Sequence, residues 1–161
     1  MLKYVFIVED TCAHFDAAIA ARDARGLKDI LDWDVTTDLK GFKRWLGELL
    51  ETVEYKNGEV GVLTDLFFPA SEISKHKEDL APLGLIVMAE CQRYRIPCVI
   101  VTAGHHHGKK YQSIFTAAKL MGWPEMVDSN DYSNIEGEVE KKDWEKALSL
   151  LEEATVKTGA G

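Results

Sequence analysis

The chain has 161 residues, of which 46% are hydrophobic and 29% are charged, and its formal net charge is −8. This length and composition predict one soluble globular domain that buries its own hydrophobic core. An acidic chain is poorly suited to bind the phosphate backbone of a nucleic acid or an anionic membrane surface. No apolar run approaches the roughly 20 residues of a membrane-spanning helix.

The three cysteines, Cys12, Cys91 and Cys98, form no Cys-x-x-Cys pair. Their odd number argues against a disulfide framework, so the predicted compartment is a reducing cytoplasm. The chain shows no internal repeat and no low-complexity segment. We therefore expect a single domain over residues 1–155, followed by a flexible tail at residues 156–161.

Apolar runs alternate with amphipathic segments along the chain. Five short runs predict strands, and five segments with apolar residues three and four positions apart predict helices. The predicted strands cover residues 3–8, 29–37, 60–68, 96–102 and 125–129. The predicted helices cover residues 11–26, 39–53, 83–95, 111–121 and 144–154. This order predicts an α/β fold in which a five-stranded parallel sheet is doubly wound, with helices on both faces.

Polar residues follow three of the predicted strands. Glu9 and Asp10 follow the first strand, Asp65 stands in the apolar stretch "GVLTDLFFP", and Thr102 ends the fourth strand. Ligands of open parallel sheets bind beyond the carboxyl ends of the strands. Three carboxylates in one crevice need a cation, and oxygen ligands of this kind suit Mg²⁺. An aspartate beside Mg²⁺ predicts phosphoryl transfer to a carboxylate, with an aspartyl phosphate as the product.

Taken in order, these motifs resemble those of response-regulator receiver domains. "FIVEDT" is similar to the acidic pair after the first strand of that family, and "LTDLFFP" to its phosphoacceptor aspartate with a proline four residues later. "LGLIVMAECQRYRIPCVIVTA" resembles its third helix and its fourth strand, which ends in Thr-Ala. The resemblance covers about residues 3–103 and implies a flavodoxin-like (βα)5 three-layer sandwich.

The resemblance also implies roles for individual residues. Asp65 would be the phosphoacceptor, and Thr102 would be the hydroxyl that contacts the phosphoryl group. Mg²⁺ would be bound by Glu9, Asp10, Asp65 and the backbone carbonyl of Phe67. A histidine kinase or a phosphotransfer protein would donate the phosphoryl group, and a downstream protein target or a homodimer would carry the output. Catalysis would be limited to the gain and loss of the phosphoryl group on Asp65.

Two features depart from the family pattern. The predicted fifth strand lies in "PEMVDSNDYSN", with no lysine in reach, whereas the family has a lysine there that pairs with the phosphoryl oxygens. The segment at residues 70–83 is longer than its counterpart in the family and could form a lid or a contact surface. The missing lysine leaves open a pseudo-receiver, which is an interaction module that is not phosphorylated.

The loop "GHHHGKK" at residues 104–110 leaves a third interpretation open. His105 and His107 could lie on the same side of an extended loop and assist the acids in a metal-dependent phosphate-ester hydrolase. Lys109 or Lys110 could supply the missing positive charge. A flexible polar loop is the simpler interpretation. Leu-Phe-Phe at 66–68 also lacks the second aspartate that is common in phosphatases which form an aspartyl phosphate.

Overall fold

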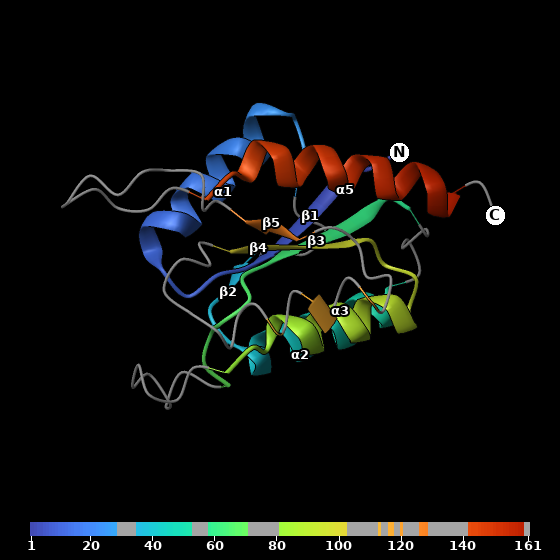
Figure 1. The fold of residues 1–161 in the computed structure, drawn as a ribbon. Helices are drawn as coiled ribbons and strands as arrows, with labels where there is room; N and C mark the ends of the chain where they lie inside the picture. The colour runs from blue at the N-terminus through green and yellow to red at the C-terminus, as the bar shows by residue number, and fades with distance from the viewer. Residues whose placement is uncertain are drawn as a thin grey trace.

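The chain folds into a parallel β-sheet between two layers of helices (Figure 1). The computed structural model describes residues 1–28, 35–52, 58–70, 81–102, 126–128 and 142–159, together with positions 113, 116, 117 and 120. Three five-residue strands form the centre of the sheet: β1 (Tyr4–Val8), β3 (Val60–Thr64) and β4 (Cys98–Thr102). The two-residue strands β2 (Val35–Thr36) and β5 (Val127–Asp128) lie at its edges, and the strand order is β2-β1-β3-β4-β5.

The described helices cover both faces of the sheet. They are α1 (Cys12–Ala24), α2 (Leu39–Glu51), α3 (Gly84–Arg93) and α5 (Trp144–Gly159). Helices α1 and α5 lie on one face, and α2 and α3 lie on the other (Figure 1). This confirms an α/β fold with a parallel sheet covered on both faces. None of the described helices is long and apolar enough to cross a membrane.

Two parts of the predicted pattern differ from the structure or lie outside it. Helix α5 ends at Gly159, so the predicted tail at 156–161 begins inside a helix. The reason is that no glycine or proline interrupts the chain between Trp144 and Gly159. Residues 29–34 of the predicted second strand, and most of the predicted helix at 111–121, lie outside the described residues.

Two hydrophobic clusters fill the space between the sheet and its helices. All residues of β3 and β4 are buried, as expected for parallel strands covered on both faces. On the side of α2 and α3, the rings of Phe6 and Trp45 stack with their centroids 4.1 Å apart. On the side of α1 and α5, Ile7, Leu63 and Leu148 belong to one buried hydrophobic cluster.

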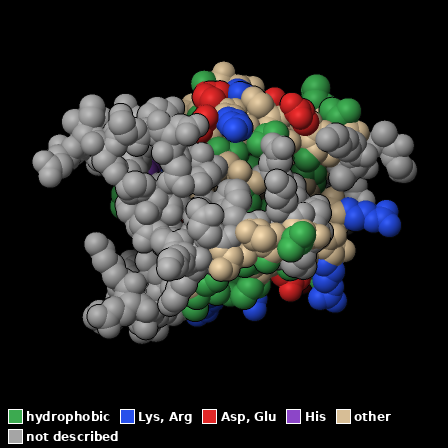
Figure 2. Space-filling view, viewed as in Figure 1, with side chains coloured by type: hydrophobic (Ala, Val, Ile, Leu, Met, Phe, Trp, Pro, Cys, Tyr) green, Lys and Arg blue, Asp and Glu red, His purple; other side chains and the backbone are tan. Residues whose placement is uncertain are grey.

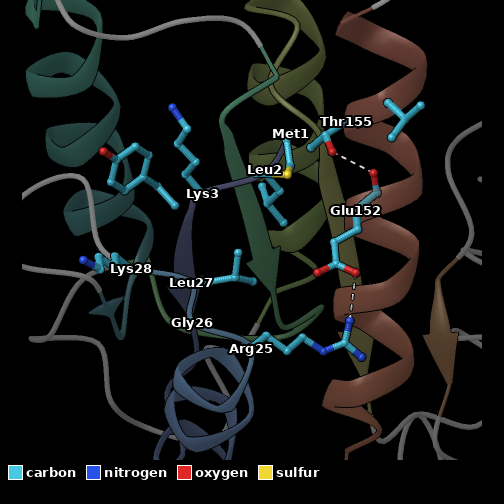
Figure 3. A pocket seen from close by; sticks show the side chains of 11 residues that line it. Met1, Leu2, Lys3, Arg25, Gly26, Leu27, Lys28, Glu152 and Thr155 are labelled. Atoms are coloured by element: carbon cyan, nitrogen blue, oxygen red, sulfur yellow. Dashed lines mark hydrogen bonds and ion pairs between the residues drawn. The ribbon is translucent and has the colours of Figure 1, made fainter.

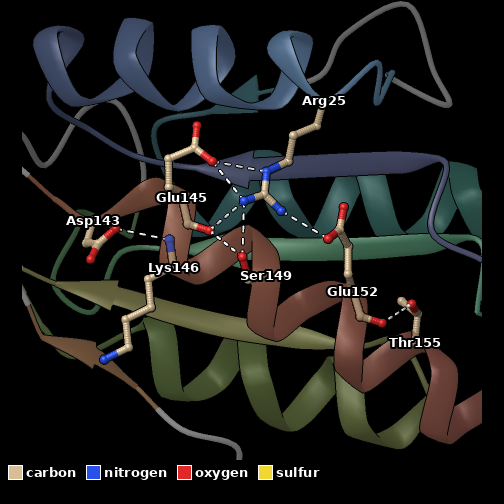
Figure 4. A network of polar contacts seen from close by, with 7 residues as sticks. All are labelled: Arg25, Asp143, Glu145, Lys146, Ser149, Glu152 and Thr155. Atoms are coloured by element: carbon tan, nitrogen blue, oxygen red, sulfur yellow. Dashed lines mark hydrogen bonds and ion pairs between the residues drawn. The ribbon is translucent and has the colours of Figure 1, made fainter.

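Arg25, directly after α1, fastens that helix to α5 (Figure 4). Its Nε and Nη2 donate to Glu145 Oε2 at 3.1 and 2.8 Å, and its Nη1 donates to Glu152 Oε2 at 3.0 Å. Nη2 also donates to Ser149 Oγ and to the carbonyl oxygen of Glu145. Single exposed ion pairs contribute little to stability, but one guanidinium that binds three residues of a helix restricts its position.

Helix α3 begins directly on the backbone that carries Asp65. The Gly84 N–H donates to the Leu66 carbonyl at 3.1 Å. A Cβ on Gly84 would lie 2.2 Å from the Asp65 carbonyl oxygen and 2.9 Å from Leu66 Cα. Any side chain at this position would therefore push α3 and the Asp65 backbone apart.

We expect Gly84→Ala to lower the free energy of unfolding by about 1–3 kcal/mol, because the methyl group meets backbone that cannot give way. Gly47→Ala is the matched control, since Gly47 is exposed on α2 and a Cβ there meets nothing within 4 Å. It should raise stability by about 0.5–1 kcal/mol. Urea denaturation of both variants measures the difference. A Gly84→Ala protein as stable as the control would contradict the close contact.

Candidate functional site

Glu9 lies at the carboxyl end of β1 and is completely buried. Its backbone N–H donates to the Thr36 carbonyl at 2.9 Å, which continues the pairing with β2. Its Oε1 accepts a hydrogen bond of 3.1 Å from the N–H of Thr11, directly before α1. The carboxylate is therefore held between the end of a strand and the start of a helix.

Asp65 lies at the equivalent end of β3. Its N–H donates to the Val8 carbonyl at 2.8 Å, and its Oδ1 accepts from the Leu66 N–H at 2.7 Å. The Thr64 hydroxyl donates to the Asp65 carbonyl at 2.9 Å. Asp65 is 9% exposed. The strand ends at Thr64, earlier than the apolar run at 60–68 predicts, so the aspartate stands at the carboxyl edge of the sheet and not within it.

The carboxylates of Glu9, Asp10 and Asp65 converge. Each offers one oxygen, and these oxygens lie within 4.8 Å of one another. Carboxylate oxygens are ligands that hard divalent cations prefer. The predicted convergence of the three acids is confirmed, and the cluster could hold a metal ion.

Lys142 places a positive charge among these acids. Its Nζ donates to Glu9 Oε2 and lies 2.9 Å from Asp65 Oδ1. The side chain is buried, and its Nζ is 5.8 Å from the centroid of the Trp144 ring, a distance at which a cation–π contact adds to its stabilisation. The expectation that the fifth strand supplies no lysine agrees with the structure, but Lys142, which the sequence motifs did not indicate, reaches the site. The lysine comes not from the fifth strand but from the segment directly before α5.

Lys142 was missed because its neighbours give an ordinary charged pattern, "EKKDWEKAL". The useful signal is the start of the helix. The Asp143 side chain accepts from the Lys146 N–H at 3.0 Å, as a helix-capping acid does, and Trp144 is buried. These two residues fix where α5 begins and so direct the preceding residue toward the sheet.

The electrostatics of the site follow from burial and from mutual repulsion. Burial raises the pKa of Glu9 to about 7, and the Asp65 carboxylate adds to this effect against the opposing influence of Lys142. Burial also raises the pKa of Asp10, again with a contribution from Asp65. Burial alone would lower the pKa of Lys142, but the Asp65 and Glu9 carboxylates outweigh it, so its pKa is raised and it remains an ammonium.

The charges of the site do not balance. Three carboxylates and one ammonium leave a formal charge of −2 when all four groups are ionised. One divalent cation would neutralise this charge. Without the cation, a proton on Glu9, whose pKa is raised to about 7, neutralises part of it. The residues present therefore fit a divalent metal both in ligand type and in charge.

The other predicted site residues are placed only in part. Thr102 is buried at the end of β4, and the register pairs Ile100 with Thr64, so Thr102 lies at the same edge of the sheet as Asp65. The Phe67 carbonyl, two residues after Asp65, stays a predicted ligand. The histidines and lysines of the loop at 104–110, and residues 71–80 of the long segment after β3, lie outside the described residues.

No protein-family model, no curated protein and no solved structure gives a significant match to this chain. The resemblance to receiver domains therefore rests on the local motifs around Glu9, Asp65 and Thr102. The geometry of the carboxylates and of Lys142 is an observation independent of that resemblance.

We expect Lys142→Met to lower the free energy of unfolding at pH 8 by about 3–5 kcal/mol, because it leaves buried carboxylates without their counter-charge. Saturating Mg²⁺ should reduce this loss, because a divalent cation can replace the ammonium. Lys146→Met, the control, removes an exposed lysine from the first turn of α5 and should change stability by no more than about 0.5 kcal/mol. Equal effects of the two substitutions in thermal or urea unfolding would contradict the buried ion pairs.

The raised pKa of Glu9 predicts a specific dependence of stability on pH in the metal-free protein. The unfolded chain releases the Glu9 proton near pH 4.5 but the folded protein only near pH 7, so stability falls as pH rises through this window. Glu9→Gln does not titrate. Between pH 4 and pH 8, the unfolding free energy of Glu9→Gln should therefore increase by about 3 kcal/mol relative to that of the wild type. Parallel stability curves in the presence of a chelator would contradict this prediction.

Proposed function

We propose that the chain is a receiver-like protein of phosphorelay signalling with a flavodoxin-like (βα)5 fold, in which Asp65 accepts a phosphoryl group. One observation carries this proposal: the carboxylates of Glu9, Asp10 and Asp65 converge with the ammonium of Lys142 at the carboxyl edge of a parallel sheet. Ligands of such sheets bind at this edge, and phosphoryl transfer requires both a nucleophile and nearby positive charge.

The proposed reaction is an in-line transfer from a phosphohistidine. Asp65 Oδ1 already accepts from the Leu66 N–H and is paired with Lys142, so Oδ2 is the oxygen that attacks phosphorus. The new P–O bond forms as the P–N bond to the histidine breaks, and the imidazole leaves with the electron pair of that bond. The donor is a histidine kinase or a phosphotransfer protein.

Mg²⁺ is the proposed metal, held by Glu9, Asp10, Asp65 and the carbonyl of Phe67. When bound, it supplies charge neutralisation at the phosphoryl group. Lys142 takes the part of the lysine that the fifth strand lacks, because its ammonium already lies 2.9 Å from Asp65 and can pair with phosphoryl oxygens. The Thr102 hydroxyl donates to the same oxygens.

The output of this protein would be binding of a downstream target or of a second copy of the chain. The proposed location is the cytoplasm, in keeping with the absence of a disulfide among the three cysteines. The pseudo-receiver is less well supported, because the argument for it was the missing lysine and Lys142 places a lysine beside Asp65. The hydrolase is not favoured, because Leu66 and Phe68 are fully buried near the position where a second aspartate would act.

We expect acetyl phosphate with Mg²⁺ to add one phosphoryl group to the wild-type protein, detectable by intact mass and lost on mild alkaline treatment. Asp65→Asn should abolish the adduct, whereas Asp16→Asn, which changes an exposed acid on α1, should keep it. Beryllofluoride with Mg²⁺ should bind the wild type and shift the amide resonances of Leu66 and Thr102.

No adduct and no beryllofluoride shift in the wild type would overturn the proposal and favour the pseudo-receiver. Sustained turnover of a generic phosphate ester that is lost in Asp65→Asn would instead favour the hydrolase. An adduct that survives Asp65→Asn would place the phosphoacceptor elsewhere in the chain.

A further inference from the structure

A cavity lies at the opposite edge of the sheet from the carboxylates of the candidate site (Figure 3). Its volume is about 820 Å³, and it lies between the start of β1, the turn after α1 and the last turns of α5. Pockets that bind small molecules measure about 300–1,000 Å³. The amino ends of the strands are not where the proposed phosphoryl chemistry occurs, so this cavity is separate from the candidate site.

The cavity has an apolar base and an apolar mouth. Leu2 and Leu27 are buried at its base, and Figure 3 shows the Leu27 side chain projecting toward α5. Met1 and Val156 also line it, and they are 90% and 69% exposed. Single exposed hydrophobic residues are normal, but two large ones beside the same cavity are typical of a surface that binds apolar groups.

The charged lining is positive although the whole chain is acidic. Lys3, Arg25 and Lys28 line the cavity against a single acid, Glu152. Arg25 pairs with Glu152 at 3.0 Å, and Lys3 pairs with Glu59 at 2.7 Å. Lys28 is exposed, and its ammonium makes no ion pair with another described residue. Figure 2 shows Lys and Arg side chains projecting from the right-hand edge of the molecule.

These features are arranged in a line across the cavity. Figure 3 places Lys28 on one side, the Arg25–Glu152 pair on the other, and Leu27 between them, and it shows the Lys28 side chain extending away from Leu27. Lys28 is exposed and its side chain is long and flexible, so its ammonium could turn toward a negative group on a ligand whose apolar body covers Leu2 and Leu27. On the side of α5, Arg25 pairs with both Glu152 and Glu145, so the described residues on this side of the cavity offer no unpaired positive charge.

We propose that this cavity binds a small organic anion with an apolar body and one carboxylate or sulfonate group. The apolar body buries Leu2, Leu27 and the exposed faces of Met1 and Val156. The anionic group pairs with the ammonium of Lys28. This proposal does not depend on phosphorylation of Asp65.

The test uses 1-anilinonaphthalene-8-sulfonate as the anionic probe and N-phenyl-1-naphthylamine, which lacks the sulfonate, as the neutral one. The wild-type protein should bind the anionic probe saturably, with an increase in fluorescence and with shifts of the Leu2 and Leu27 methyl resonances. Lys28→Glu should weaken binding of the anionic probe at least about fivefold and leave the affinity for the neutral probe unchanged. Val156→Gln should weaken binding of both probes, because it removes apolar contact without adding charge.

Lys43→Glu is the matched control, since it reverses an exposed charge on α2 outside the cavity. It should bind both probes as the wild type does. Cooperative thermal unfolding of each variant excludes binding of the probe to a partly unfolded state. Absence of saturable binding to the folded wild type, or equal affinities in Lys28→Glu and Lys43→Glu, would overturn the proposal.

Discussion

The ion pairs of Lys142 with Glu9 and Asp65 join three segments that are distant in the chain: the end of β1, the end of β3 and the start of α5. Burying charges costs several kcal/mol per ion, and apolar side chains of similar size often stabilise a core better. A buried cluster with an excess of negative charge is therefore poor as a stabilising device. It is the arrangement of a functional site, and the three acids could hold a metal ion.

The parallel pairing of β1 and β3 is what brings the two carboxylates together. Val8 lies opposite Thr64, so the next residue of each strand, Glu9 and Asp65, emerges at the same level of the sheet. The Asp65 N–H is tied to the Val8 carbonyl, and α3 presses on the Asp65 backbone through Gly84. The acid positions are thus set by backbone contacts rather than by flexible side chains.

Local patterns were enough to predict Asp65 and Glu9, because each follows a short run of buried residues and the carboxyl ends of parallel strands meet at one edge. They were not enough for Lys142. Its contact with Glu9 depends on how α5 packs on the sheet, which the buried Trp144 and the ion pairs of Arg25 determine. Neither of these contacts produces a recognisable hydrophobic pattern in the sequence "EKKDWEKAL". The strongly amphipathic helix α2 (Leu39–Glu51) was predicted over residues 39–53, because its apolar stripe is a local signal.

Helix α5 has a fixed place, which constrains how Lys142 can act. Arg25 binds three of its residues, and Leu151 packs so closely on β3 that a Cβ on Gly61 would lie 2.8 Å from it. A sliding movement of the helix would break these contacts together. In the proposed reaction, transfer of the ammonium from Glu9 to a phosphoryl group on Asp65 would therefore require rotation of the long Lys142 side chain and not displacement of α5. Because the Nζ already touches both carboxylates, such a rotation needs little movement of the surrounding core.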